Sequence, residues 1–167
     1  MSQFAVSWRL SRGRFDEAVG ELTHAQLTWR LHPGTLTLGE AAVHVAGVEV
    51  WFIAQLTGKT LEGFGARVAQ CATEGVVNDH PFPFPPDELT PETIGRALAL
   101  GREAVGAVIE NPSPDLLQKE IKSALGPIIT GEGALARLAF HPGYHQGQAH
   151  LIRTATGFPG SQSAPPH

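Results

Sequence analysis

The sequence has a single cysteine, Cys71, and this scarcity excludes two classes of small protein. One cysteine cannot form an internal disulfide, so a disulfide-stapled secreted domain is excluded, and so is a cysteine-rich zinc site. Because thiols stay reduced in the cytoplasm, we expect a cytoplasmic protein. Polar side chains recur every few positions in the first ten residues, so we expect no signal peptide.

Charged residues are also scarce, at 17% of 167 residues against about 25% in an average soluble domain. Twelve Lys+Arg against sixteen Asp+Glu give a net charge of -4 at pH 7, whereas a dedicated nucleic-acid binder normally has a basic face. No apolar run approaches the roughly 18 residues of a membrane span. We therefore expect neither nucleic acid nor a membrane as a partner.

Four segments have the apolar periodicity of amphipathic helices. They cover approximately residues 2–19, 37–58, 90–111 and 132–156. Residues 58–89 form a long connection, and loops of that length are uncommon and often functional. The pattern predicts an all-α fold, a four-helix bundle with a long crossover between the second and third helices.

Local signals refine this prediction. Thr37 and Glu40 have the spacing of a capping box at the start of the second helix. Residues 120–125 are ambiguous between a short strand and a turn. We expect one domain over residues 1–159, followed by a disordered tail at 160–167.

Eight histidines, beside one tyrosine and one methionine, are the unusual feature of the composition. His44 lies about 60° from Ala41 and about 40° from Val48 around the second helix, at the edge of its apolar stripe. His141 and His145 are four residues apart, so they stack on one face of the fourth helix. Three inward imidazoles with an open fourth position are the ligand set of a catalytic zinc site.

The residues alone leave a second interpretation open, in which these histidines are hydrogen-bonded core side chains without a metal. The four-residue spacing is weak evidence in a histidine-rich chain, but unpaired buried polar groups are costly, and all three are expected to point inward. His150 follows His145 by about 140° around the helix and is expected to point elsewhere. The remaining histidines are expected to be solvated: His24, His32, His80 and His167.

Four other side chains near the histidines are expected to have lesser roles. Glu40 is expected to act in the capping box rather than as a partner of the His44 ring. Glu49 is more consistent with an exposed charge than with a buried acid. Tyr144 is expected to pack, and Cys71 has no basic neighbour in sequence that would activate it as a nucleophile.

Two stretches of the sequence resemble the DinB/YfiT-like family of damage-inducible metalloenzymes. The closing stretch is His141-Pro-Gly-Tyr-His145-Gln-Gly147-Gln148, followed by Arg153 and Gly157. The earlier stretch is Leu22-Thr23-x-x-Gln26, Pro33-Gly34, Thr37-x-x-Glu40-x-x-x-His44, then Glu49 and Trp51. The likeness extends over residues 22–157, and its most specific part is the HxxxHxGQ segment.

The resemblance implies a four-helix bundle, often dimeric, with one metal-ligating histidine on the second helix and two on the fourth. By matching position these are His44, His141 and His145. Better-understood relatives are metal-dependent transferases that act with low-molecular-weight thiols, or thiol-dependent isomerases. The resemblance therefore implies a divalent Zn, Ni or Fe ion, a small-molecule substrate that includes such a thiol, and a homodimer.

Three functions are compatible with this sequence. The first is a metalloenzyme that transfers a low-molecular-weight thiol to an electrophile at the three-histidine site. The second is a metalloenzyme that carries out metal-assisted hydrolysis at the same site. The alternative is a non-catalytic, stress-associated dimeric bundle that binds a metal or an apolar ligand.

The sequence departs from the family pattern at Pro142-Gly143, between the paired histidines. Proline removes a helix hydrogen bond and clashes with the preceding turn, and glycine costs about 1 kcal/mol in a helix. We expect either a kink at Phe140 that moves His141 out of register with His145, or a helix that starts at Pro142.

Overall fold

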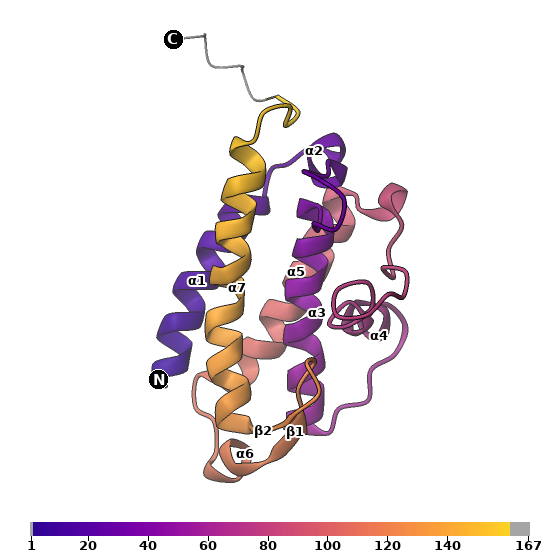
Figure 1. Cartoon of the computed structure of the whole chain (residues 1–167). Helices are drawn as coiled ribbons and strands as arrows, with labels where there is room; N and C mark the ends of the chain where they lie inside the picture. Colours follow the sequence, from indigo (N-terminus) through magenta and orange to yellow (C-terminus); the bar gives the residue numbers. More distant parts are fainter. Residues whose placement is uncertain (1, 161–167) are drawn as a thin grey trace.

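Four long helices form the fold of this chain. In the computed structural model, which describes residues 2–160, they are α1 (Gln3–Val19), α3 (Leu38–Thr57), α5 (Pro91–Ile109) and α7 (Gly131–Thr154). Helix α1 packs along α7, α3 packs along α5, and α3 also contacts α7 (Figure 1). The predicted all-α four-helix bundle is confirmed.

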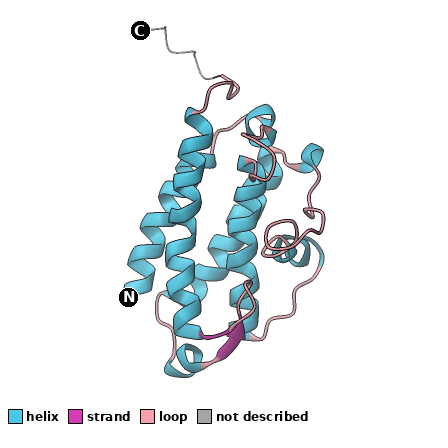
Figure 2. Cartoon of the chain, in the orientation of Figure 1, coloured by secondary structure: helices cyan, strands magenta, loops and turns pink. Residues whose placement is uncertain are grey.

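Short elements join the long helices; most lie at the two ends of the bundle, and one short helix lies along its side (Figure 2). They are α2 (His24–Thr28), α4 (Gly63–Gln70), the 3₁₀ turn η1 (Pro86–Glu88), α6 (Pro114–Gln118), β1 (Glu120–Lys122) and β2 (Ile128–Thr130). The two strands pair antiparallel, with Ile121 opposite Ile129. The ambiguous segment at 120–125 is therefore the first strand of a hairpin and the start of its turn. Of the tail expected at 160–167, residues 161–167 lie outside the described part.

The helix starts follow the capping signals of the sequence. At α3 the backbone N–H of Glu40 donates to the Thr37 hydroxyl over 3.1 Å, and Glu40 accepts from the Thr37 N–H over 2.7 Å. These two bonds satisfy backbone groups that a helix N-terminus otherwise leaves without partners. Across the described residues, no helix combines the length and apolar character that crossing a membrane requires.

The long crossover exists because α3 and α5 run in the same direction, so the chain returns along the bundle between them (Figure 1). On the way, α4 lies against α3. Contact is close at Gly47, where a Cβ atom would lie 2.5 Å from the carbonyl oxygen of Val68 and 3.0 Å from the amide nitrogen of Ala72. A side chain at position 47 would therefore push the end of α4 away from α3.

Helix α7 passes through Pro142 without interruption. Both expectations for this position, a kink that displaces His141 and a helix start at Pro142, are wrong. A proline loosens the preceding turn, and there the Ser11 hydroxyl of α1 donates to the carbonyl of Ala139 over 2.7 Å. A Cβ on Gly143 would lie 3.4 Å from the Ser11 Cβ, an ordinary contact distance, so α1 passes close to α7 at this turn. Packing against α1 thus supports the helix where its own sequence weakens it.

Candidate metal centre

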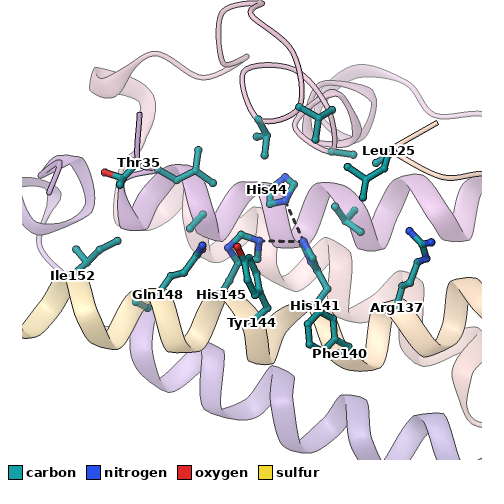
Figure 3. A pocket seen from close by; sticks show the side chains of 18 of the residues that line it. Thr35, His44, Leu125, Arg137, Phe140, His141, Tyr144, His145, Gln148 and Ile152 are labelled. Atoms are coloured by element: carbon teal, nitrogen blue, oxygen red, sulfur yellow. Dashed lines mark hydrogen bonds between the residues drawn. The ribbon is translucent and has the colours of Figure 1, made fainter. Parts of the chain in front are cut away.

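Three histidine side chains from two helices meet at one point in the bundle. His44 points from α3 toward His141 and His145 on α7 (Figure 3). Nε2 of His141 lies 3.1 Å from Nε2 of His44 and 3.1 Å from Nε2 of His145. One ring nitrogen from each histidine lies within 4.8 Å of the other two, so the group can hold a metal ion. His44 and His145 are buried, and His141 is partly buried.

The orientation of His44 is set by the crossover. Its Nδ1 lies 2.7 Å from the carbonyl oxygen of Cys71, the residue that follows α4. Because a carbonyl oxygen can only accept, Nδ1 carries the proton and donates it. Neutral His44 therefore has its lone pair on Nε2, directed at the other two histidines. A hydrogen bond of this kind is what commonly orients a metal-ligating imidazole.

The three Nε2 atoms cannot satisfy one another by hydrogen bonding. If Nε2 of His141 is protonated, its single N–H can be donated to only one of the two neighbouring Nε2 atoms. The other Nε2 atom then has no hydrogen-bond partner in His141. If it is not protonated, its lone pair faces the lone pair of His44. Nδ1 of His141 is also buried, with no hydrogen-bond partner among residues 2–160. Such uncompensated burial is costly in a core without a ligand.

A divalent cation resolves this arrangement, because it accepts all three lone pairs at once. Zn–N bonds of about 2.0–2.1 Å in tetrahedral geometry put neighbouring nitrogens about 3.3–3.4 Å apart. The two separations of 3.1 Å are close to that value. The donor set therefore fits a metal better than it fits a set of hydrogen-bonded core histidines.

Burial keeps these imidazoles in the neutral form that binds metal. It lowers the pKa of His44, against the opposing effect of the Cys71 carbonyl. Burial, followed by the neighbouring His44, lowers the pKa of His145 to about 3, although Gln148 opposes the shift. Burial and then the other two histidines hold the pKa of His141 well below its usual range. At neutral pH none of the three needs to lose a proton before it can bind a cation.

A cavity of about 720 Å³ opens beside the histidines. That volume lies within the range of about 300–1,000 Å³ that is typical of small-molecule sites. Its walls come mainly from α3, α7, the loop after α2, the turns that follow α4 and the β-hairpin. Most of the lining is apolar; the polar side chains beside the three histidines are His32, Thr35, Ser123, Arg137, Tyr144 and Gln148.

Two side chains differ from their expected places. Tyr144 is half exposed at the cavity, with its ring centroid 5.1 Å from that of His145, instead of packing away from the site. Glu49 is 1% exposed instead of solvated, and pairs with Arg12 on the other side of α3. Glu49 follows His44 by five residues, or about 140° around the helix, so its side chain faces other neighbours than the His44 ring does. Its burial is explained by partners that are far away in the sequence, which the apolar periodicity of one helix cannot predict.

The remaining assignments agree with the sequence prediction. Glu40 stays in the capping box and contacts Arg30 rather than His44. Burial raises the pKa of the Cys71 thiol to about 12, which makes it unreactive at neutral pH. The other described histidines are exposed, namely His24, His32, His80 and His150, while His167 lies outside the described residues.

Two contributors were missed at the level of sequence. One is the Cys71 backbone carbonyl, for which no sequence signal exists, because any residue carries one. The other is Arg137, which lines the cavity. Its signal was available, since it precedes His141 by four residues and therefore shares the face of α7 that carries both histidines.

Comparison with known protein families supports the fold. The family model of the DinB superfamily matches residues 7–149, a stretch that includes all three histidines. A search of curated proteins found no match to the sequence.

Proposed function

The chain belongs to the DinB superfamily, and from that membership we propose that it is a metal-dependent enzyme that transfers a low-molecular-weight thiol to an electrophile. The proposed metal ligands are His44, His141 and His145. The observation that carries the proposal is the convergence of their three Nε2 atoms at the wall of a cavity large enough for a small molecule.

The chain itself supplies binding, orientation and a mostly apolar environment. The Cys71 carbonyl directs the lone pair of His44 into the site, and burial keeps all three rings neutral. Mostly apolar walls accept the organic part of a substrate. Three neutral imidazoles suit Zn²⁺, Ni²⁺ or Fe²⁺. An ion bound there supplies Lewis acidity, which lowers the pKa of a thiol or a water molecule.

Thiol transfer demands less of this site than hydrolysis does. A free thiol has a pKa near 8.5, so a small depression yields thiolate at neutral pH, whereas bulk water starts near 15.7. Cys71 is a poor source of the thiol, because it is buried and its pKa is raised to about 12. The nucleophile is therefore proposed to be a small-molecule thiol that enters through the cavity.

Metal content tests the first half of this proposal. Untagged protein, purified without chelator and incubated in turn with Zn²⁺, Ni²⁺ and Fe²⁺, should hold close to one ion per chain by mass spectrometry. Alanine at any of the three ligand positions should abolish stoichiometric binding, and His150→Ala, an exposed histidine of the same helix, should leave it unchanged. Protein without metal under all three conditions would overturn the proposal.

Thiol consumption tests the second half. Metal-loaded protein should accelerate the loss of free thiol from cysteine or glutathione in the presence of a chloronitroaromatic electrophile. His145→Ala should remove that acceleration, and His150→Ala should keep it. Release of product from ester substrates without thiol consumption would instead assign metal-assisted hydrolysis. A loaded protein inactive in both assays would be a binding protein.

A further inference from the structure

One side chain gives the cavity its permanent charge. Among the described residues that line the cavity, the guanidinium of Arg137 is the only group charged at every physiological pH. Figure 3 shows Arg137 and Gln148 extending from α7 on either side of the paired histidines. The three histidines thus lie between a cationic and a neutral polar side chain, in a mostly apolar cavity.

Arg137 is held in place by a neutral group. Its Nη1 donates to the Ser123 hydroxyl over 2.9 Å. Ser123 is buried in the turn of the β-hairpin, where its N–H donates to the Pro127 carbonyl and its own carbonyl accepts from the N–H of Gly126. The hairpin therefore positions the guanidinium without neutralising it.

Five other arginines have a carboxylate partner, whereas Arg14, Arg96 and Arg153 make no ion pair within residues 2–160, but these three do not line the cavity. Arg12 pairs with Glu49, Arg30 with Glu40, and Arg67 with Glu88. Within residues 2–160 Arg137 makes no ion pair, and its contact with Ser123 uses one of its five N–H donors. The unused donors of a partly buried cation in an apolar cavity form a strong site for an anion, because charge-assisted hydrogen bonds strengthen where water is excluded.

We propose that Arg137 binds a carboxylate group of the small molecule that occupies this cavity, so the site selects organic acids with an apolar body. This inference rests on the proposed function, to which it adds the substrate class. Arg137 precedes His141 by one helical turn, or about 6 Å of rise. A molecule that contacts both the histidines and the guanidinium therefore needs only a few bonds between its reacting group and its carboxylate. The carboxylate can belong to the electrophile or to the thiol.

Matched acids and neutral analogues test the proposal by calorimetric titration of the full chain. Phenylbutanoate and phenylbutanamide share an apolar body without a thiol, whereas N-acetylcysteine and N-acetylcysteamine differ by a carboxylate and share the thiol. Each pair is titrated into protein as purified and into protein stripped by chelator, in which no metal can attract the acid. Wild-type protein should bind at least one acid about tenfold to a hundredfold tighter than its neutral analogue. The pair that shows the preference identifies which substrate carries the carboxylate.

Substitutions assign the preference to Arg137. Arg137→Gln should reduce it to less than about twofold, and Arg137→Lys should retain part of it, because lysine keeps the charge but not the planar fork. Arg14→Gln removes an equal charge from the exposed face of α1 and should leave the preference intact. Thermal unfolding followed by circular dichroism checks that the variants fold.

Equal affinity for acid and neutral analogue in both pairs would overturn the inference without reference to any variant. A preference that survives Arg137→Gln would also overturn it. An acid preference lost in Arg137→Gln, in protein that binds no metal, would support the inference and overturn the proposed function. Stoichiometric metal binding without a preference for the acid would overturn the inference about Arg137 and leave the proposed function supported.

Discussion

Helix α3 buries two polar clusters that differ in how their members are satisfied. The ion-pair cluster consists of Trp8, Arg12 and Glu49, and the histidine cluster consists of His44, His141 and His145. Glu49 and His44 are five residues apart on α3 and both are almost inaccessible to solvent. One faces α1 and the other faces α7 and the cavity.

In the ion-pair cluster, opposite charges compensate one another: Arg12 pairs with Glu49 and also with Asp16 at the edge of the cluster, and only Oε2 of Glu49 lacks a hydrogen-bond partner among its carboxylate oxygens. Oε1 of Glu49 accepts from Arg12 Nε and from Trp8 Nε1, each over 2.9 Å, and Arg12 also donates to the Leu98 carbonyl. Helix α5 closes the cluster, because a Cβ on Gly101 would lie 2.3 Å from Oε2 of Glu49. Burial raises the pKa of Glu49, while Arg12 and then Trp8 oppose that shift.

In the histidine cluster, three neutral groups bring lone pairs together beside an open cavity. The Cys71 carbonyl pairs with Nδ1 of His44, but the three Nε2 atoms face one another, so their burial makes sense with a ligand present. The comparison separates two meanings of a buried polar group. A group paired by its own chain stabilises the fold, and a group that lacks such a partner indicates what the fold binds.

Removal of the Glu49 carboxylate should disrupt the ion-pair cluster and should lower the stability of the protein more than any other substitution proposed below. Glu49→Ala removes the buried carboxylate and leaves Arg12 with Asp16 as its remaining carboxylate partner, so we expect a loss of about 3 kcal/mol in the free energy of unfolding, measured with denaturant. Glu103→Ala, at an exposed position of α5, should change it by less than about 0.5 kcal/mol. Metal bound per folded chain should not change. A loss below about 1 kcal/mol would show that the cluster contributes little.

Acid should destabilise the metal-free protein through the histidine cluster. Below the ordinary histidine pKa of about 6.5 the unfolded chain takes up protons, whereas His145 stays neutral in the fold down to a pKa of about 3. The unfolded state then binds more protons, so stability falls as pH falls through this window, by up to about 1.4 kcal/mol per pH unit for each such histidine. Denaturant titrations of chelated protein between pH 7 and 5 measure the slope. His145→Ala should flatten it, and an unchanged slope in that variant would contradict the assignment.

Gly47→Ala should disturb the histidine cluster from outside it. The new methyl group would meet the Val68 carbonyl and displace α4, together with the Cys71 carbonyl that orients His44. We expect a loss of about 1–3 kcal/mol in stability and a loss of tenfold to a hundredfold in metal affinity, by analogy with the removal of other ligand-orienting groups. Competition with a chromogenic chelator measures the affinity.

Gly95→Ala is the matched control for that substitution. A Cβ at position 95, in α5, would have no heavy atom within 4 Å. Alanine there should leave metal affinity unchanged and stabilise the protein by up to about 1 kcal/mol, because it favours the helix. Metal affinity preserved in Gly47→Ala would mean that the crossover does not orient His44.

Pro142→Ala should have the smallest effect. His141 and His145 are already in register on a continuous α7, so metal affinity should change by less than about threefold, or about 0.7 kcal/mol. Ser11→Ala is expected to cost about 1 kcal/mol of stability, because the Ala139 carbonyl loses its hydroxyl donor. A gain of tenfold or more in metal affinity on removing the proline would show that it holds His141 out of register.

The sequence predicted what depends on neighbours along the chain. Apolar periodicity located the four long helices to within about two residues, and the Thr37–Glu40 capping box marked the start of α3. The four-residue spacing of His141 and His145 predicted that both lie on one face of α7. The position of His44 at the edge of the apolar stripe of α3 predicted that it points into the bundle. The effect of Pro142 was predicted wrongly: α7 stays continuous, and Ser11 of another helix donates to the Ala139 carbonyl, 128 residues away, in the turn before the proline.

By itself, then, the sequence determined the bundle, its long crossover and the three histidines that face its interior, because helical register is set by local spacing. Only the tertiary structure decided that Glu49 is buried, since Arg12 and Trp8 lie 37 and 41 residues from it. It also decided the tautomer of His44, through a carbonyl 27 residues away, and the place of Arg137 in the cavity. Burial and pairing depend on which distant groups meet, and periodicity along one helix carries no information about them.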